Sequence, residues 1–408
     1  MQNFSLLGTQ QQHGYASVLA GQLGATLNLP LVPYPGIPPV LELNPDPPPP
    51  VIPVSTTGPA EPRVDPTLQA NNISVPGFNL DNALNLVPSV GPNASPVQEW
   101  AYVVLALPGL PNNATPTQLQ TAQALKPTTV VEWLGSNDAL VPALLGQLNA
   151  LTPIDRFAAD YESLLASLQK TGATLIVANV PDVTEVPYFT PVETLAHQAG
   201  LRVDYVANKL GVGTADYLRL SAIPVAEAIL KGAPSAPSSL PQACASPTSS
   251  LSSQPVPCVL TAADANTLRV SIGCYNLIIE LEAALHGALV VDIHSLVDRI
   301  YTKGYTLPNG TNLTPTYLGG LFSFDGIHPT DTGYGIIANA FIDAINQRFH
   351  THYADADVSA IFEQDSLRLD IVPYTGPLPA SPAKPALAKA CLAGLLSPLA
   401  TALSSSLH

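Results

Sequence analysis

The residues best suited to acid–base chemistry lie in the segment 324–329, FDGIHP. A carboxylate three residues before a histidine can share a tight turn with it, accept a hydrogen bond from its ring and hold the imidazole as a general base. An Asp-Gly turn with an incidental histidine has the same sequence. Of the eight histidines, only His328 has such a partner in a turn ahead of an expected helix. We therefore take Asp325 and His328 as candidate catalytic residues.

Two further segments carry groups that can bind developing negative charge. An expected strand runs into the segment 135–138, GSND, and an Asn137 side chain at a strand end can donate an N–H into a crevice. The same tetrapeptide is also ordinary turn sequence. In the segment 72–81, NISVPGFNLD, we expect a short strand to end at Gly77 and a helix to follow through Leu84. A glycine can offer its backbone N–H to a ligand without steric obstruction, although Gly77 is also explained as a loop glycine.

Alternating strands and helices must position these groups. Apolar, β-branched runs predict strands at residues 128–135, 173–180 and 288–293. Apolar residues on one face predict helices at residues 155–170, 261–286 and 331–349. Such alternation indicates a parallel sheet with helices on both faces. Because ligands bind at the carboxyl ends of these strands, we expect the chemistry after Gly135, after Val180 and near the last helix.

In this order, Gly77 and the segments 135–138 and 325–329 resemble the second, third and fifth sequence blocks of the SGNH/GDSL hydrolase family of serine esterases and lipases. The resemblance spans residues 13–349, and residues 179–184 are similar to the family's segment after the third block. It implies an α/β fold: a flavodoxin-like, three-layer α/β/α sandwich with a parallel sheet. It also implies that Asn137 and the Gly77 N–H form an oxyanion hole, that His328 is the base and that Asp325 orients it. It implies no cofactor.

The front of the chain departs from this family. The family's nucleophile is a serine in a Gly-Asp-Ser-Leu block after the first strand, and the sequence contains neither that block nor Gly-x-Ser-x-Gly. Residues 11–23 resemble the family's first helix, so we expect the chain to begin downstream of the nucleophile block. The serine, the first strand and a signal peptide would then lie upstream, and the chain as given would be inactive. The alternative is that Ser5 is the nucleophile, although four residues before it are too few for a strand.

The composition limits the partners and the organisation. The 408 residues carry 15 Lys and Arg against 30 Asp and Glu, a net charge of −15, which argues against nucleic acid or an anionic membrane as a partner. No apolar run is long enough to predict a transmembrane segment. Many of the 43 prolines fall in a few irregular stretches. We expect one domain over residues 1–355, with a proline-rich insertion at 30–66 and a Ser/Pro-rich loop at 233–257, and a partly irregular C-terminal extension over 356–408.

Four cysteines bear on the compartment. None forms a C-x-x-C pair or lies near a histidine at zinc spacing, so we expect no metal site. Cys244 and Cys258 flank a Ser/Pro-rich stretch, and a disulfide between them fits an exported protein; two free thiols fit the spacing as well. The pairing of Cys274 and Cys391 stays open. We expect the full-length protein to be secreted or periplasmic.

These features predict an esterase or lipase that acts on a small-molecule or lipid ester. A carbohydrate acetyl esterase on the same fold is one alternative. The other is a non-catalytic binding protein that kept the fold, for which the proline-rich residues 30–66 offer an interaction surface. The oligomeric state stays open.

Overall fold

The computed structural model describes residues 1–44, 51–54, 63–105, 116–244, 255–381 and 391. Parts of the three irregular stretches expected from the sequence, among them residues 47–50 and most of the C-terminal extension beyond 381, lie outside these ranges. The central sheet has the strand order β10-β4-β3, and all its strands run parallel. Its strands are β3 (Thr129–Glu132), β4 (Thr174–Ala178) and β10 (Leu289–Val291).

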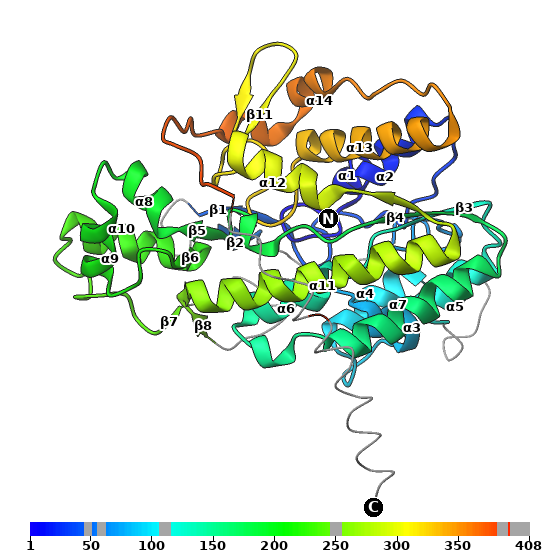
Figure 1. Cartoon of the computed structure of the whole chain (residues 1–408), viewed down its shortest axis with the longest axis horizontal. Coiled ribbons are helices and arrows are strands. Elements are labelled where there is room, and N and C mark those ends of the chain that lie inside the picture. Colours follow the sequence, from blue (N-terminus) through cyan, green and yellow to red (C-terminus); the bar gives the residue numbers. More distant parts are fainter. Residues whose placement is uncertain (45–50, 55–62, 106–115, 245–254, 382–390, 392–408) are drawn as a thin grey trace, which may run out of the picture.

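Helices cover both faces of this sheet (Figure 1). Successive side chains of a strand point to opposite faces, and β4 follows this rule. Leu175 and Val177 join one apolar core, whereas Ile176 and Ala178 join another on the opposite face. The first core is completed by α6 (Ser136–Leu145), α7 (Ile154–Gln169) and α11 (Ala262–His286), and the second by α2 (Tyr15–Gln22), α12 (Ile293–Lys303) and α13 (Asp331–Phe349). The expected three-layer α/β/α sandwich is confirmed.

The long helices follow the apolar periodicity of the sequence to within a residue at each end, whereas the strands are shorter than expected. The first expected strand ends at Glu132, because the Leu134 N–H donates to the Glu132 carboxylate, 2.7 Å away, rather than to a neighbouring strand. Residues 133–135 therefore turn out of the sheet and lead into α6.

Two local expectations are wrong. Residues 72–76 do not form a strand, because their backbone bonds to loops and side chains: the Asn72 N–H donates to the Asn28 carbonyl and the Ile73 carbonyl accepts from Gln118. Residues 11–23 do not form one helix. Gly14 has extended backbone angles, φ −63° and ψ 154°, and separates α1 (Gly8–Gln11) from α2.

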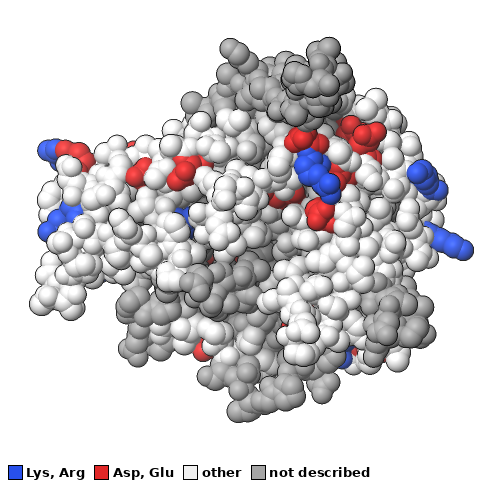
Figure 2. All heavy atoms as spheres, turned by 90° about the horizontal axis from the view of Figure 1, so that it is seen from below, with Lys and Arg blue, Asp and Glu red and all other residues white. Residues whose placement is uncertain are grey.

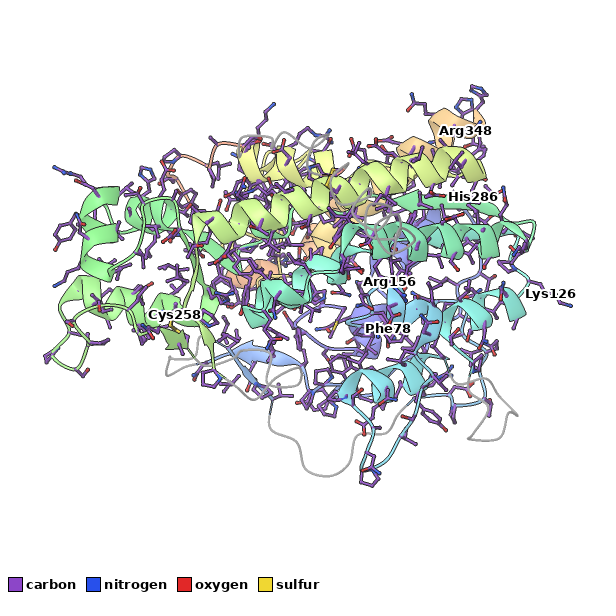
Figure 3. All side chains as sticks on the ribbon, turned by 60° about the horizontal axis from the view of Figure 1, so that its bottom comes forward. Phe78, Lys126, Arg156, Cys258, His286 and Arg348 are labelled. Carbon is purple, nitrogen blue, oxygen red and sulfur yellow. A yellow bond between two sulfur atoms is a disulfide. The ribbon has the colours of Figure 1, made fainter. Side chains whose placement is uncertain are left out.

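A separate lobe follows β4 and lies to the left in Figure 1. It has its own apolar core, to which Val192, Val206 and Leu218 contribute. The disulfide between Cys244 and Cys258, the pair proposed from the sequence, closes a loop in this lobe, where Figure 3 labels Cys258. The elements of the lobe are β5 (Phe189–Pro191), α8 (Val192–Gln198), α9 (Val203–Leu210), β6 (Tyr217–Arg219), α10 (Ile223–Lys231), β7 (Ala243–Cys244), β8 (Val256–Pro257) and β9 (Val259–Leu260).

The chain after α13 returns to the main body. Helix α14 (Val358–Gln364) packs against α13, and the Asp365 carboxylate accepts hydrogen bonds from the N–H and the hydroxyl of Thr332. A second disulfide joins Cys274 of α11 to Cys391. The boundary expected at residue 355 stays a prediction. The remaining elements of the described ranges are β1 (Leu41–Leu43), β2 (Val51–Pro53), α3 (Leu80–Asn85), α4 (Pro96–Leu105), α5 (Gln118–Ala124), β11 (Tyr305–Thr306) and β12 (Asn312–Leu313), besides four short 3₁₀ turns.

The face of the molecule that Figure 2 draws carries few charged side chains among its described residues. On the face that Figure 2 draws, most described atoms belong to uncharged residues, and Lys and Arg lie mainly toward its two ends. Among the described helices, none combines the length and the apolar composition that crossing a membrane requires.

Candidate active site

The turn before α13 holds Asp325 and His328 together. The His328 Nδ1 lies 2.8 Å from the Asp325 Oδ2. The other carboxylate oxygen, Oδ1, accepts from the Ile327 N–H at 2.7 Å, the His328 N–H at 2.8 Å and the Ser323 hydroxyl at 3.1 Å. A fifth donor comes from the start of the chain: the Phe4 N–H lies 2.7 Å from Oδ2. Asp325 is thus a buried carboxylate with three hydrogen-bond donors to Oδ1 and two to Oδ2.

These contacts set the protonation of the pair. Burial by itself would raise the pKa of Asp325, but the nearby His328 and the hydrogen bonds to the carboxylate outweigh it and lower that pKa below its usual value. An ionised carboxylate only accepts, so the hydrogen between the two side chains lies on Nδ1 of His328. In the neutral ring Nε2 then carries the lone pair. The side chain of His328 is one-quarter exposed, and Nε2 is the ring atom with the free lone pair that a base needs.

A cavity of about 210 Å³ connects His328 with the two other candidate segments. His328, Asn137 and Gly77 all line it, although they come from three distant parts of the sequence. Much of the remaining lining is apolar, and Trp100, Leu140, Val141 and Leu144 are among its members. The structure therefore brings the candidate base and the two candidate hydrogen-bond donors to one partly apolar cavity.

Asn137 and Gly77, which both line this cavity, each carry N–H groups that can bind an anion. The Asn137 amide nitrogen donates one hydrogen to the Phe78 carbonyl at 2.9 Å, and Phe78 itself, labelled in Figure 3, is buried. An amide nitrogen carries two hydrogens. The bond to Phe78 fixes the orientation of the Asn137 side-chain amide and uses one of them, so the second is available to a ligand. Gly77 has φ +73°, a left-handed conformation that favours glycine. Within the described residues, the Gly77 N–H has no hydrogen-bond acceptor.

Helix α6 positions Asn137 through two neighbours. Gly135 precedes it with φ +105°, and a Cβ there would lie 2.9 Å from the Val180 side chain, so the turn requires glycine. Asp138 accepts from the Leu80 N–H at 3.1 Å and the Thr152 hydroxyl at 2.7 Å, and so ties the start of α6 to the start of α3. Burial raises the pKa of Asp138 to about 6 despite these bonds.

Ser5 is not brought to this cavity. Its side chain is fully buried, and its hydroxyl donates to the Pro38 carbonyl at 2.6 Å. Its neighbours Phe4 and Leu6 line the cavity, whereas Ser5 is directed away from it. Ser74 does line the cavity, but within the described residues no serine hydroxyl is hydrogen-bonded to His328.

The sequence patterns did not predict that three residues, Phe4, Tyr334 and Asp138, contribute to this site. Phe4 touches Asp325 through its N–H and His328 through its ring, at 6.3 Å between ring centroids. Tyr334, on the first turns of α13, lines the cavity, and its hydroxyl contacts the Met1 backbone. Asp138 alone had a usable signal, because an acidic residue in the first turn of an expected helix can bond to backbone N–H groups.

The site resembles no metal centre. In the described ranges, no group of three or more His, Cys, Asp or Glu residues is placed to hold a metal ion.

Comparisons with known proteins add little to this geometry. No protein-family model matches the sequence, and a search of curated proteins finds no match. A search of solved structures finds LAE5, described as an α/β hydrolase enzyme from the metagenome of Lake Arreo, Spain, at 18% identity and a TM-score of 0.27. The match covers 55% of this chain and 66%, just under two thirds, of that one. So slight a likeness carries no argument about fold or function, and membership of the SGNH/GDSL family stays a prediction.

Proposed function

We propose that this chain belongs to a hydrolase of carboxylic esters that works through a serine nucleophile. The observation that carries the proposal is the cavity that His328, hydrogen-bonded to Asp325, lines together with Gly77 and Asn137. Acyl transfer needs both parts: a base that removes a proton from the nucleophile, and donors that bind the negative oxygen of the tetrahedral intermediate.

The proposed reaction follows from these positions. The serine hydroxyl gives its proton to Nε2 of His328 while its oxygen attacks the ester carbonyl carbon. The carbonyl electron pair moves to the oxygen, which is bound by the N–H groups of Gly77 and Asn137. As the intermediate collapses, the bond to the alcohol breaks and His328 returns the proton to the departing alkoxide. Water repeats the sequence on the acyl-enzyme and releases the acid.

We propose further that the serine lies before Met1. Two observations support this. Met1 lines the cavity beside His328, so residues preceding it would enter next to the base. Strand β3 pairs with β4 alone within the described residues, so its other edge has no partner strand there, and Val131 of this strand is 37% exposed.

The nucleotide sequence upstream of Met1 tests this part directly. We expect an in-frame Gly-Asp-Ser-Leu block preceded by a strand and a signal peptide. If the upstream frame is closed or lacks the block, the proposed position of the serine is wrong.

The lining of the cavity bears on the substrate. Trp100 and the three apolar residues of α6 favour an acyl chain over an acetyl group on a sugar, because burial of methylene groups stabilises binding. Hydrolysis rates on p-nitrophenyl esters of increasing chain length, measured beside acetylated sugars, separate the two. We expect kcat/KM to rise with the first added methylenes; a preference for acetylated sugars would favour the carbohydrate acetyl esterase.

Covalent labelling separates an enzyme from a binding protein. A non-catalytic binding role is the second candidate, favoured by the burial of Ser5 away from His328. A fluorophosphonate probe should label the chain extended upstream and should fail to label its His328→Ala variant. An extended chain that contains the serine and still resists the probe would favour the binding role.

We propose a secreted or periplasmic location for the full-length protein. The disulfides Cys244–Cys258 and Cys274–Cys391 support it, because disulfides persist in oxidising compartments. Fractionation of cells that express the extended chain tests it, and a wholly cytoplasmic, reduced protein would contradict it.

A further inference from the structure

A turn near the start of the chain has a costly backbone conformation. The Ser5 N–H donates to the Gln2 carbonyl at 3.1 Å, and the two residues between them, Asn3 and Phe4, have φ values of 47° and 56°. Positive φ at both central residues is the mark of a type I′ turn, which Asn tolerates and a bulky residue such as Phe rarely adopts. Such strain persists only where surrounding contacts impose it, and it gathers at functional sites.

The contacts that impose the strain lead to the candidate base. The Asn3 N–H donates to the Ser323 hydroxyl at 3.0 Å, and the Asn3 side-chain oxygen accepts from the Phe324 N–H at 2.9 Å. The Phe4 N–H donates to the Asp325 carboxylate at 2.7 Å. Two residues of the turn thus bind three consecutive residues of the segment that carries Asp325, across more than 300 positions of sequence.

The bond from Phe4 reaches the oxygen that matters most. Asp325 Oδ2 accepts both from Phe4 and from Nδ1 of His328, so two donors fix its position. The Asp325 side chain is only 3% exposed, so water cannot readily replace a lost donor. Without the Phe4 N–H, one lone pair of Oδ2 would have no hydrogen-bond partner, which is costly for a buried carboxylate. The Phe4 ring also meets the His328 ring edge-on, and both line the cavity.

We propose that Asn3 and Phe4 are positioning residues for the base: their left-handed turn directs the Phe4 N–H onto Asp325 and its ring onto His328, and so fixes the orientation of the imidazole. The inference rests on the proposed function, in which His328 is the base. The competing explanation is that the turn only fastens the start of the chain to the domain.

The hydrogen on Nδ1 of His328 reports on this role without any need for catalysis. In the chain as it stands, with isotope-labelled histidine, we expect an exchange-protected, far-downfield proton signal that disappears in His328→Ala. Asn3→Ala removes the acceptor for the Phe324 N–H and disfavours the left-handed backbone, so the signal should move upfield or vanish through exchange. Asn3→Gly, which keeps the left-handed backbone, should move it less.

Ser5→Ala is the matched control. It removes a buried hydrogen bond from the same segment, to Pro38, but touches neither Asp325 nor His328. It should lower the melting temperature and leave the histidine signal unmoved. If Asn3→Ala lowers the melting temperature and likewise leaves the signal unmoved, the turn is only a fastening and the proposal is overturned.

A milder variant keeps the proposal testable if Asn3→Ala does not fold. Phe4→Gly retains the N–H and relieves the backbone strain but removes the ring, so the Asp325 bond should survive and the ring of His328 should become more mobile. An unchanged histidine signal with unchanged ring dynamics would overturn the role of the Phe4 ring.

Activity gives an independent arm in the chain extended upstream. Asn3→Ala should lower kcat by up to about 100-fold and leave KM within a factor of about two, since misplacing a catalytic group by an ångström has effects of that size. If the wild-type extended chain has no activity, the proposed function is contradicted. The positioning role of Asn3 and Phe4 is still tested by the histidine proton signal, which does not depend on activity.

Discussion

The two sides of the cavity differ in how far their polar groups are already paired. On the side of the proposed base His328, called the base side here, Asp325 accepts five hydrogen bonds and its pKa is lowered. On the opposite side, the N–H of Gly77 has no acceptor within the described residues, and the Asn137 amide uses one of its two hydrogens. A base must hold one orientation before the ligand arrives, whereas donors for an oxyanion must stay unpaired until it forms.

The carboxylates of the two sides show the same contrast. The Asp138 carboxylate, next to Asn137, accepts from one backbone N–H and one hydroxyl, and burial raises its pKa to about 6. Asp325 is buried as well, yet its many donors and the adjacent imidazole reverse the direction of the shift. Burial alone therefore does not decide the direction of the shift: the adjacent imidazole and the hydrogen-bond donors lower the pKa of Asp325, whereas burial outweighs the two donors at Asp138.

The largest expected effect comes from breaking the base side. Asp325→Ala leaves five donors without an acceptor, so we expect a loss of about 3–5 kcal/mol in the free energy of unfolding. In the extended chain kcat should fall by about 10⁴-fold, because the imidazole loses its orientation and tautomer. Urea unfolding and ester hydrolysis measure the two. Asp155→Ala, at an exposed position, is the control, and a similar loss there would remove the distinction.

Breaking the opposite side should affect catalysis more than folding. Asn137→Ala removes one proposed donor to the oxyanion and one bond to the Phe78 carbonyl. We expect kcat to fall by about 10²–10³-fold and the free energy of unfolding by only about 1 kcal/mol. Asn149→Ala, an exposed asparagine just beyond α6, should change neither. An unaltered kcat in Asn137→Ala would contradict the proposed oxyanion hole.

The contrast between the carboxylates predicts a pH dependence. Between about pH 4 and pH 6 the folded state keeps the Asp138 proton that the unfolded chain has lost, so stability falls as pH rises through this window. The contribution is about 3 kcal/mol or less, from 1.4 kcal/mol for each pKa unit. Asp138→Asn can keep both partners without a charge and should lose this dependence.

Asp325 gives the opposite dependence. Its lowered pKa stabilises the folded state above the ordinary Asp pKa, and this stability is lost as pH falls through the folded value. Urea unfolding at pH 3, 4, 6 and 8 therefore separates the two groups. Equal slopes for wild type and Asp138→Asn between pH 4 and pH 6 would show that Asp138 does not carry the effect.

The smallest effect on activity is expected at Ser5. Its hydroxyl bonds to the Pro38 carbonyl, away from the cavity, so Ser5→Ala should cost about 1 kcal/mol in stability. In the extended chain, ester hydrolysis and fluorophosphonate labelling should stay within a factor of about two of wild type, because Ser5 touches no group of the proposed reaction. Loss of labelling in this variant would make Ser5 the nucleophile and overturn the expectation of an upstream serine.

Local patterns account for much of the fold. The apolar periodicity of residues 155–170 and 331–349 places α7 and α13 to within a residue, because a helix buries one face and its period is visible in the sequence. The segment 72–76 looks like a strand for the same local reasons and is not one. A strand exists only through a partner, and no local pattern specifies whether a partner lies alongside.

By itself, the sequence determined the types of the chemical groups and their local frames. Asp325 and His328 lie three residues apart, and a tight turn is enough to join them. Only the tertiary structure decided three other features. His328 lines one cavity with Gly77 and Asn137, and the Phe4 N–H is the fifth donor to Asp325. Ser5 lies outside this cavity, with its hydroxyl bonded to the Pro38 carbonyl. These contacts join residues far apart in the chain, and they depend on how the helices pack on the sheet, which no short-range pattern encodes.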